Sequence, residues 1–502
     1  MTLGMRDGAA LSLVLGCLLG GSRAAAREPA RQDAEGRTPS TRADTLPGRV
    51  DSLAGNWEGT LKTSGIELRV VFRIQRAKDG SYSATMDSPD QGARGILVSD
   101  VSFSGRAVKL TSAAVGGVFE GRLAEDGSTI EGEWRQGGAT LPLVLRRVEQ
   151  VTEVRRPQEP VPPYPYEVEQ VRYPNAEVGN ELAGTLTLPR GEGPFPAAVL
   201  ISGSGPQDRD ETVFGHRPFW ILADYLTRRG IAVLRFDDRG VGGSTGSFPT
   251  ATSEDFASDV RAGIAYLRTR PRVDAKRIGL IGHSEGGLIA PMVAAEDPSV
   301  AFVVLMAGPG LPGTEILERQ AALIARAGGA PEEAIERNRR LQLELFEIVR
   351  EEPDTAAAAK KLQAAIRQAL ASLSEEEKAR AGLQGDPERV VEAQVRQVNS
   401  PWFRFFLTYD PRPTLRRVKA PVLAIGGELD LQVPPKQDLD AIAAALKAGG
   451  NPDFTVKQLA GLNHLFQEAK TGAPAEYGRI EQTVSPEALK LIGDWILKRM
   501  GG

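Results

Sequence analysis

The stretch that most constrains the fold is residues 277–290, which read R-I-G-L-I-G-H-S-E-G-G-L-I-A. A short apolar run that stops at a glycine and is followed at once by a helix-compatible run predicts a strand, a tight turn and a helix. Ser284 lies at the turn, two residues after Gly282 and two before Gly286. Small residues at these places let strand and helix approach closely, so that the serine hydroxyl can meet a base. The pattern predicts a nucleophile elbow, with a glycine-rich turn of an ordinary α/β domain as the alternative.

A serine nucleophile needs a histidine base, and enzymes with this kind of elbow place the acid and the histidine after the serine in the chain. The chain has three histidines. His216 precedes Ser284, and His283 is next to it on a turn that directs neighbouring side chains apart. His464 therefore remains as the candidate base, in a loop after the strand-like residues 454–459.

The acid that orients the base should follow a strand between Ser284 and His464. Residues 421–425 (P-V-L-A-I) predict such a strand, and two acids come soon after it. Asp430 is the preferred candidate. Glu428 is the second candidate, and a solvated loop charge is the simpler interpretation of its side chain.

Two further motifs precede the elbow, G-S-G-P-Q-D-R-D at residues 203–210 and F-D-D-R-G-V-G-G-S at residues 236–244. With the elbow, Asp430 and His464, they make residues 167–502 resemble the α/β-hydrolase superfamily, and within it the serine esterases and serine-aminopeptidase-like hydrolases. The resemblance implies the α/β-hydrolase fold, a mostly parallel sheet with helices on both faces. It also favours Asp430, because G-x-x-D-x-x-V-P after a strand is the family's arrangement.

The resemblance further implies a role for each residue of the site. Ser284 would attack a carbonyl carbon, His464 would move the proton, and Asp430 would orient the imidazole. The backbone N–H groups of Glu285 and of Ser204 would hold the oxyanion.

The beginning of the chain has the layout of a secretory signal peptide over residues 1–26, with Arg6, an apolar segment, and small residues up to Ala26. Cleavage near Ala26 predicts export to the periplasm or outside the cell. The apolar segment is too short to span a bilayer, so no stable membrane insertion is expected. The only cysteine, Cys17, lies in this segment, and a lipid anchor on it stays open as an alternative.

Composition changes along the chain predict its domains. Residues 27–48 predict a disordered leader. Short alternating runs with turn signals over residues 49–147 predict a small antiparallel β domain, a sandwich or a barrel. Proline-rich residues 148–166 predict a semi-rigid linker with few contacts to either side, so that a chain starting near Tyr164 should fold alone. Residues 167–502 then form the hydrolase domain.

One interval in the hydrolase domain lacks strand signals and has helical spacing of its apolar residues, which predicts a helical cap insertion at residues 311–412. Its last part concentrates aromatic residues. Trp402, Phe403 and Phe406 are candidates for the wall of a pocket for an acyl or alcohol group, and packing between cap and sheet is the equally favoured alternative.

These features predict a secreted serine hydrolase (EC 3.1.1) that cleaves short acyl or aryl carboxylic esters through an acyl-enzyme. An aminopeptidase-like or thioester hydrolase, and a catalytically idle binding protein, are the alternatives. The 61 Lys and Arg balance 65 Asp and Glu, and no block of like charge predicts a nucleic-acid partner. No metal cluster is visible, no cofactor is expected, and the oligomeric state stays open.

Overall fold

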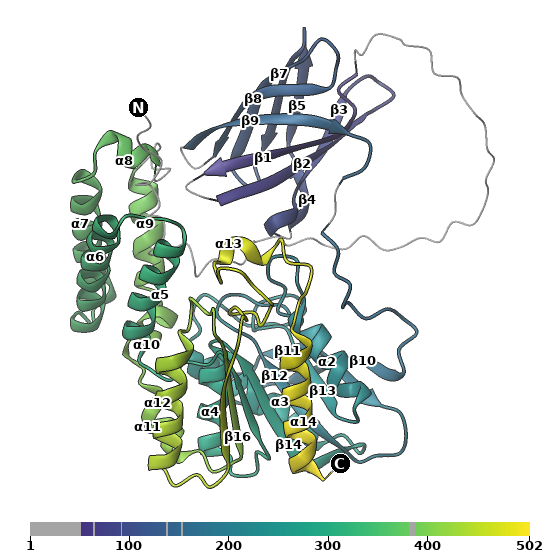
Figure 1. Cartoon of the computed structure of the whole chain (residues 1–502), viewed down its shortest axis with the longest axis vertical. Helices are drawn as coiled ribbons and strands as arrows, with labels where there is room; N and C mark the ends of the chain where they lie inside the picture. Colours follow the sequence, from purple (N-terminus) through teal and green to yellow (C-terminus); the bar gives the residue numbers. More distant parts are fainter. Residues whose placement is uncertain are drawn as a thin grey trace, which may run out of the picture.

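The computed structural model describes residues 52–63, 66–91, 93–136, 139–151, 154–380 and 387–501. The predicted signal peptide and leader, together with Cys17, lie outside the described residues. The described chain forms two sheets and a group of helices beside them (Figure 1). No helix in these ranges is both long enough and apolar enough to cross a membrane.

The N-terminal part is one nine-stranded sheet in the order β4-β3-β2-β1-β9-β8-β7-β6-β5, with antiparallel neighbours. Ser112 Oγ of β6 donates to Leu97 O of β4, and the N–H of Ser99, just after β4, donates to Thr111 O of β6, so the sheet curves around its own apolar core. The predicted antiparallel β domain is confirmed, in a barrel-like form. Its strands are β1 Gly55–Thr63, β2 Ile66–Arg76, β3 Tyr82–Ser88, β4 Ala93–Val98, β5 Asp100–Ser104, β6 Ala107–Ser112, β7 Gly117–Leu123, β8 Thr129–Gln136 and β9 Ala139–Val148, with the 3-10 helix η1 Pro89–Gln91.

The second sheet has eight strands in the order β10-β11-β13-β12-β14-β15-β16-β17. Pairs β10–β11 and β11–β13 are antiparallel and the others are parallel. The central strands are apolar along their length because they are buried on both faces. The strands are β10 Tyr166–Pro174, β11 Glu181–Pro189, β12 Phe195–Ile201, β13 Ala232–Phe236, β14 Val273–His283, β15 Val303–Met306, β16 Val422–Gly427 and β17 Phe454–Leu459.

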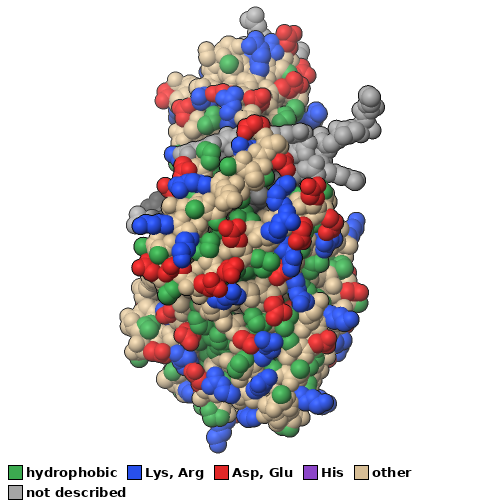
Figure 2. Space-filling view, turned by 90° about the vertical axis from the view of Figure 1, so that its left-hand side faces the viewer, with side chains coloured by type: hydrophobic (Ala, Val, Ile, Leu, Met, Phe, Trp, Pro, Cys, Tyr) green, Lys and Arg blue, Asp and Glu red, His purple; other side chains and the backbone are tan. Residues whose placement is uncertain are grey.

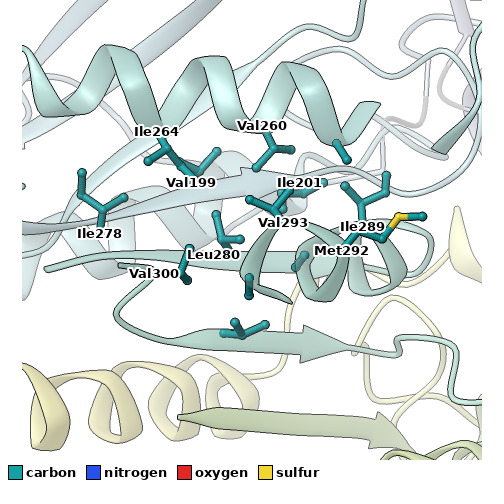
Figure 3. Close-up of a cluster of buried hydrophobic side chains, with 14 of the residues drawn as sticks. Val199, Ile201, Val260, Ile264, Ile278, Leu280, Ile289, Met292, Val293 and Val300 are labelled. Carbon is teal, nitrogen blue, oxygen red and sulfur yellow. The ribbon is translucent and has the colours of Figure 1, made fainter. Parts of the chain in front are cut away.

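Helices cover both faces of this sheet, which confirms the predicted α/β-hydrolase fold. On one face α2 (Pro218–Arg228) and α14 (Pro486–Met500) enclose an apolar cluster. On the other face lie α3 (Ser253–Arg268), α4 (Gly286–Glu296), α11 (Pro411–Arg417) and α12 (Pro435–Ala448). Figure 3 shows how Val260 and Ile264 of α3 and Val293 of α4 meet Val199 and Leu280 of the sheet.

The helical cap is inserted between β15 and β16, beside the sheet in Figure 1, and it has an apolar core of its own. Its outer surface carries ion pairs such as Arg339–Glu318 and Arg367–Glu388, and Figure 2 shows basic and acidic side chains mixed on this side of the molecule. The cap helices are α5 Gly313–Ala327, α6 Glu332–Glu351, α7 Thr355–Ala371, α8 Glu375–Arg380, α9 Pro387–Val398 and α10 Pro401–Thr408.

The linker differs from its prediction, because it is hydrogen bonded to the hydrolase domain. The Arg156 guanidinium donates to the carbonyl oxygens of Phe214, Gly215, Gly478 and Ile480 at 2.9 to 3.2 Å. Burial lowers the pKa of Arg156 to about 10. Proline content sets the stiffness of a segment, but it does not reveal whether a side chain within it finds acceptors.

A second linker side chain makes similar contacts. Gln158 Oε1 accepts the N–H groups of Thr483 and Val484, and its Nε2 donates to Val484 O. The β domain touches the same region, because the backbone of Gly478 packs closely against the backbone of Asp90. A Cβ added to Gly478 would lie only 2.0 Å from the carbonyl oxygen of Asp90. The linker and the edge of the β domain therefore support the loops between β17 and α14.

Candidate active site

Ser284 lies in the turn between β14 and α4, and its backbone has φ +52, in the left-handed region that a residue with a side chain rarely adopts. Its N–H donates to Met306 O at 2.9 Å, which ties the turn to the neighbouring strand β15. The side chain is half-buried. Such strained turns persist where surrounding structure fixes them, and they are typical of functional sites.

The two glycines of the predicted elbow allow backbones to meet. A Cβ on Gly282 would lie 2.0 Å from Gly286 O, and a Cβ on Gly286 would lie 2.0 Å from Ile201 O. Neither position has room for any side chain, so the strand, the turn and the start of α4 can pack as they do only with glycine there.

His464 and Asp430 are brought together by the loops that follow β17 and β16. His464 Nδ1 lies 2.8 Å from Asp430 Oδ2, and both side chains are buried. Asp430 Oδ1 accepts the N–H groups of Gln432 and Val433 at 2.8 and 2.9 Å, which fixes the carboxylate. Because Nδ1 faces the carboxylate, Nε2 is the ring nitrogen that can exchange a proton with a substrate or a nucleophile.

The alternative acid, Glu428, has a different environment. Its side chain is exposed, and its Oε2 accepts the N–H of Gly461 at 2.8 Å. The structure therefore pairs His464 with Asp430 and places Glu428 at the entrance of the His464 loop.

The loop after β12 lies against the elbow, because a Cβ on Gly203 would be 3.1 Å from Ser284 Cβ. The Gly203 N–H is engaged, since it donates to Glu211 Oε1 at 2.7 Å. Within the ranges that the structure describes, no protein acceptor is paired with the N–H of Ser204 or of Glu285. These are the two donors that the sequence predicts for the oxyanion.

The Glu285 side chain is buried beside the serine and connects three elements. Its Oε1 accepts Ser253 Oγ of α3 at 2.6 Å and Trp402 Nε1 of α10 at 2.7 Å. Burial raises the pKa of Glu285, and the hydrogen bonds from Ser253, Trp402 and Ser204 oppose that shift. The carboxylate therefore links the elbow to the cap.

The predicted pocket residues separate into two groups. Trp402 contacts the elbow through Glu285 and stacks on Phe406, with ring centroids 5.2 Å apart. Phe403 and Phe406 are buried in the apolar core of the cap, where Phe403 packs on Phe346. Cap packing thus accounts for Phe403 and Phe406, whereas Trp402 faces the elbow.

A cavity of about 10 Å³ lies under the loop after β12, with Ser202, Gly203, Asp238 and Glu285 among its lining residues. Asp238 accepts hydrogen bonds from Ser202 Oγ and from Gln207 N–H, and burial raises its pKa well above the ordinary value. The cavity has about the volume that one water molecule needs.

Sequence reasoning missed a contact between Glu211 and His283. Glu211 Oε1 lies 2.9 Å from His283 Nδ1, and His283 Nε2 lies 3.0 Å from the backbone oxygen of His464. Burial disfavours a charged ring, but the carboxylate and the carbonyl outweigh it and raise the pKa of His283. The scarcity of histidine was the one available signal, since one of the three stands beside the nucleophile. Among the described residues, no group of His, Cys, Asp or Glu is arranged to hold a metal ion.

The model of the alpha/beta hydrolase family matches residues 198–477. The chain belongs to this family. The match spans the sheet from β12 to β17 and includes Ser284, Asp430 and His464. It also spans the helical cap that is inserted between β15 and β16.

The relatives of this α/β hydrolase cover only parts of it. Esterase EstD of Thermotoga maritima is 34% identical over 149 residues, which are 30% of this chain and 35% of that protein. Thiohydrolase apmlB of Arthrinium phaeospermum is 40% identical over 88 residues, 16% of this chain and 27% of that one. Among solved structures, the α/β hydrolase GrgF from Penicillium sp. sh18 is similar, with TM-score 0.42, 19% identity, and coverage of 67% of this chain and 100% of that one.

Proposed function

We propose that the protein is a serine hydrolase that cleaves carboxylic esters of short acyl or aryl groups. The observation that carries the proposal is the 2.8 Å contact between His464 Nδ1 and Asp430, on loops at the same end of the sheet as the strained Ser284. The family membership and a relative named as an esterase support it.

In the proposed reaction, His464 Nε2 takes the proton of Ser284 Oγ as the oxygen bonds to the ester carbonyl carbon. The N–H groups of Ser204 and Glu285 receive the negative oxygen, each contributing about 3 kcal/mol of transition-state stabilisation. The tetrahedral intermediate then expels the alcohol, which takes the proton from His464. Water repeats the sequence on the acyl-enzyme, which releases the acid and restores Ser284, while Asp430 stabilises the imidazolium in both halves.

Esters are favoured over N-terminal peptide bonds because of the environment of Glu285. An aminopeptidase must hold an α-ammonium group, and Glu285 is the acid next to the serine. Its Oε1 is already occupied by Ser253 and Trp402, and burial raises its pKa, which disfavours the charge that an ammonium group needs. Thioesters are a second candidate, because a relative is named as a thiohydrolase and a thiolate leaves by the same steps.

We also propose that the protein is exported, with cleavage of the signal peptide near Ala26. The apolar segment and the small residues that precede Ala26 support this. N-terminal sequencing of the secreted protein would test it, because a chain that keeps its first residues, or carries a lipid on Cys17, contradicts the cleavage site.

The test of the proposed function compares three kinds of bond: the ester of p-nitrophenyl butyrate, the thioester of a butyryl thioester, and the amide of an aminoacyl p-nitroanilide, which also carries the free amine that an aminopeptidase requires. We expect kcat/KM to be highest for the ester and a fluorophosphonate probe to label wild type but not Ser284→Ala. Absence of labelling would favour a catalytically idle binding protein. A preference for the anilide that disappears in Glu285→Gln would overturn the ester assignment, and a preference for the thioester would establish the second candidate.

A further inference from the structure

We propose that Glu211 and His283 form a buried ion pair that positions two loops, the loop after β17 that carries His464 (the His464 loop) and the loop after β12 that carries Gly203 and Ser204 (the oxyanion loop). Neither residue would touch the substrate, so both are positioning residues. The inference rests on the proposed function for its kinetic effect, but the ion pair itself can be observed without any substrate.

The two ring nitrogens of His283 both face acceptors. Nδ1 lies 2.9 Å from a carboxylate oxygen of Glu211, and Nε2 lies 3.0 Å from the carbonyl oxygen of His464. A neutral imidazole has only one N–H, whereas an imidazolium has two, so a ring that donates to both acceptors is protonated. His283 and Glu211 are both buried, so an imidazolium at His283 would require the Glu211 carboxylate as its partner, because a buried charge without a partner is costly.

The groups around the ring support the same assignment. Glu211 is the acidic partner in direct contact, and the charge of Asp430 also favours a protonated His283. Two aromatic rings also lie near His283, the His464 ring at 4.9 Å and the Phe466 ring at 6.4 Å, centroid to centroid. His464 meets His283 through its backbone oxygen, while its own Nδ1 faces Asp430.

Glu211 extends the contact to the other side of the elbow. The oxygen that pairs with His283 also accepts the Gly203 N–H at 2.7 Å, in the residue before Ser204. Glu211 has φ +52, and within the described chain its other oxygen, Oε2, is buried without a hydrogen-bond partner. A positioning role explains why Glu211 keeps a strained backbone and a carboxylate oxygen without a hydrogen-bond partner. If the side chain served only for packing, an apolar residue could replace it at lower cost.

One connected set of hydrogen bonds therefore runs from the oxyanion loop through Glu211 and His283 to the His464 backbone. Loss of the Glu211 charge should leave His283 with one N–H, so that one of its two contacts is lost. The His464 loop or the oxyanion loop would then relax, and misplacement of a catalytic group by about 1 Å can lower the rate on the order of 100-fold.

The first test is imidazole nitrogen NMR on the full chain with labelled histidine, which gives signals from only three residues. At pH 7 we expect both nitrogens of His283 to show imidazolium shifts. His216 is the internal reference, because burial lowers its pKa to about 4 and its ring is neutral at pH 7. His283→Gln assigns the signal. A neutral His283 in wild type would overturn the ion pair whatever the enzyme hydrolyses.

The second test is Glu211→Gln, whose amide oxygen can still accept the Gly203 N–H. We expect the His283 imidazolium signal to disappear and kcat for the ester to fall on the order of 10 to 100-fold, with KM changed less than about threefold. Glu428→Gln is the matched control, because Glu428 also accepts a backbone N–H beside the His464 loop but is exposed and pairs with no histidine.

The outcomes separate the two proposals. If wild type shows the imidazolium but hydrolyses no ester, the ion pair stands and the proposed function fails. If Glu211→Gln loses the imidazolium and keeps its kcat, or if Glu428→Gln is equally damaging, the positioning role is overturned.

Discussion

Trp402 Nε1 lies 2.7 Å from Oε1 of Glu285, so the cap is hydrogen bonded to the residue that follows the candidate nucleophile. Trp402→Phe keeps an aromatic ring over Phe406 but removes the donor. A hydrogen bond contributes about 0.5 to 1.5 kcal/mol net, and about 1.4 kcal/mol of transition-state stabilisation corresponds to a tenfold rate change. We therefore expect kcat/KM for p-nitrophenyl butyrate to fall by up to about tenfold.

The control for that variant is Trp495→Phe. Trp495 Nε1 donates to Thr455 Oγ1 at 3.1 Å, on a helix away from the elbow, so the same chemical change is made elsewhere. Equal losses in the two variants would mean that the Trp402 contact has only a general effect on stability.

Asp430→Asn should lower kcat on the order of 10⁴-fold, because an amide no longer stabilises the imidazolium and can favour the wrong tautomer of His464. Glu428→Gln should change kcat little, since its amide oxygen can still accept the Gly461 N–H. Steady-state kinetics on the ester decides between them. The acid is misassigned if the Glu428 variant is the more damaged of the two.

Arg156→Ala should lower the stability of the hydrolase domain, because four backbone oxygens lose their donor. Arg155→Ala is the neighbouring control, since Arg155 is exposed and its side chain forms a surface ion pair with Glu481, 3.3 Å away, which contributes little to stability. Urea unfolding of the two full-length variants gives the comparison.

The same contacts change the expectation for shortened chains. A chain that starts at Tyr164 lacks Arg156 and Gln158, whereas one that starts at Val154 keeps both. We expect the longer chain to hydrolyse ester and the shorter one to be less stable. Equal stability of the two would show that the linker contacts are dispensable.

Asp438 gives a pH-dependent prediction. Burial raises its pKa to about 7. The N–H groups of Gly310 and Leu311, which donate to Oδ1, favour the charged form and oppose this rise only in part. The unfolded chain ionises this group near pH 4, so its contribution to stability is greatest below pH 4, falls as pH rises toward 7, and stays low above it. The fully developed loss is roughly 4 kcal/mol.

Asp438→Asn removes this ionisation. We expect the free energy of unfolding of the variant, relative to wild type, to increase between pH 5 and pH 8 in urea titrations. Asp440→Asn on the same helix is the control, because Asp440 is exposed. A difference between variant and wild type that does not change with pH contradicts the prediction.

Local patterns were sufficient to predict the elements that position the site. The apolar run before Ser284 forms β14, the run before Asp430 forms β16, and the elbow has glycine where two backbones meet. These elements follow from hydrophobic periodicity and from the space that a turn leaves, which are properties of short segments.

Contacts between distant segments could not be predicted in this way. Glu211 and His283 are 72 residues apart, and nothing near Glu211 indicates that its carboxylate faces a histidine. The prediction that the linker makes few contacts was likewise based on its prolines. Its contacts come from the side chains of Arg156 and Gln158, which proline content does not reveal. Phe403 and Trp402 both pack against the apolar core of the cap, and the additional hydrogen bond from Trp402 to Glu285 could not be predicted from their adjacent positions in the sequence.

The contacts of Gln158 join an early and a late part of the chain during protein synthesis. Its partner Thr483 is 325 residues further along the chain, so the linker leaves the ribosome long before the residues to which it is hydrogen bonded. His464 belongs to the same late segment. A nascent chain therefore contains Ser284 before it contains His464 or the partners of the linker, and under the proposed function such an incomplete chain would not hydrolyse esters in the cell that makes it.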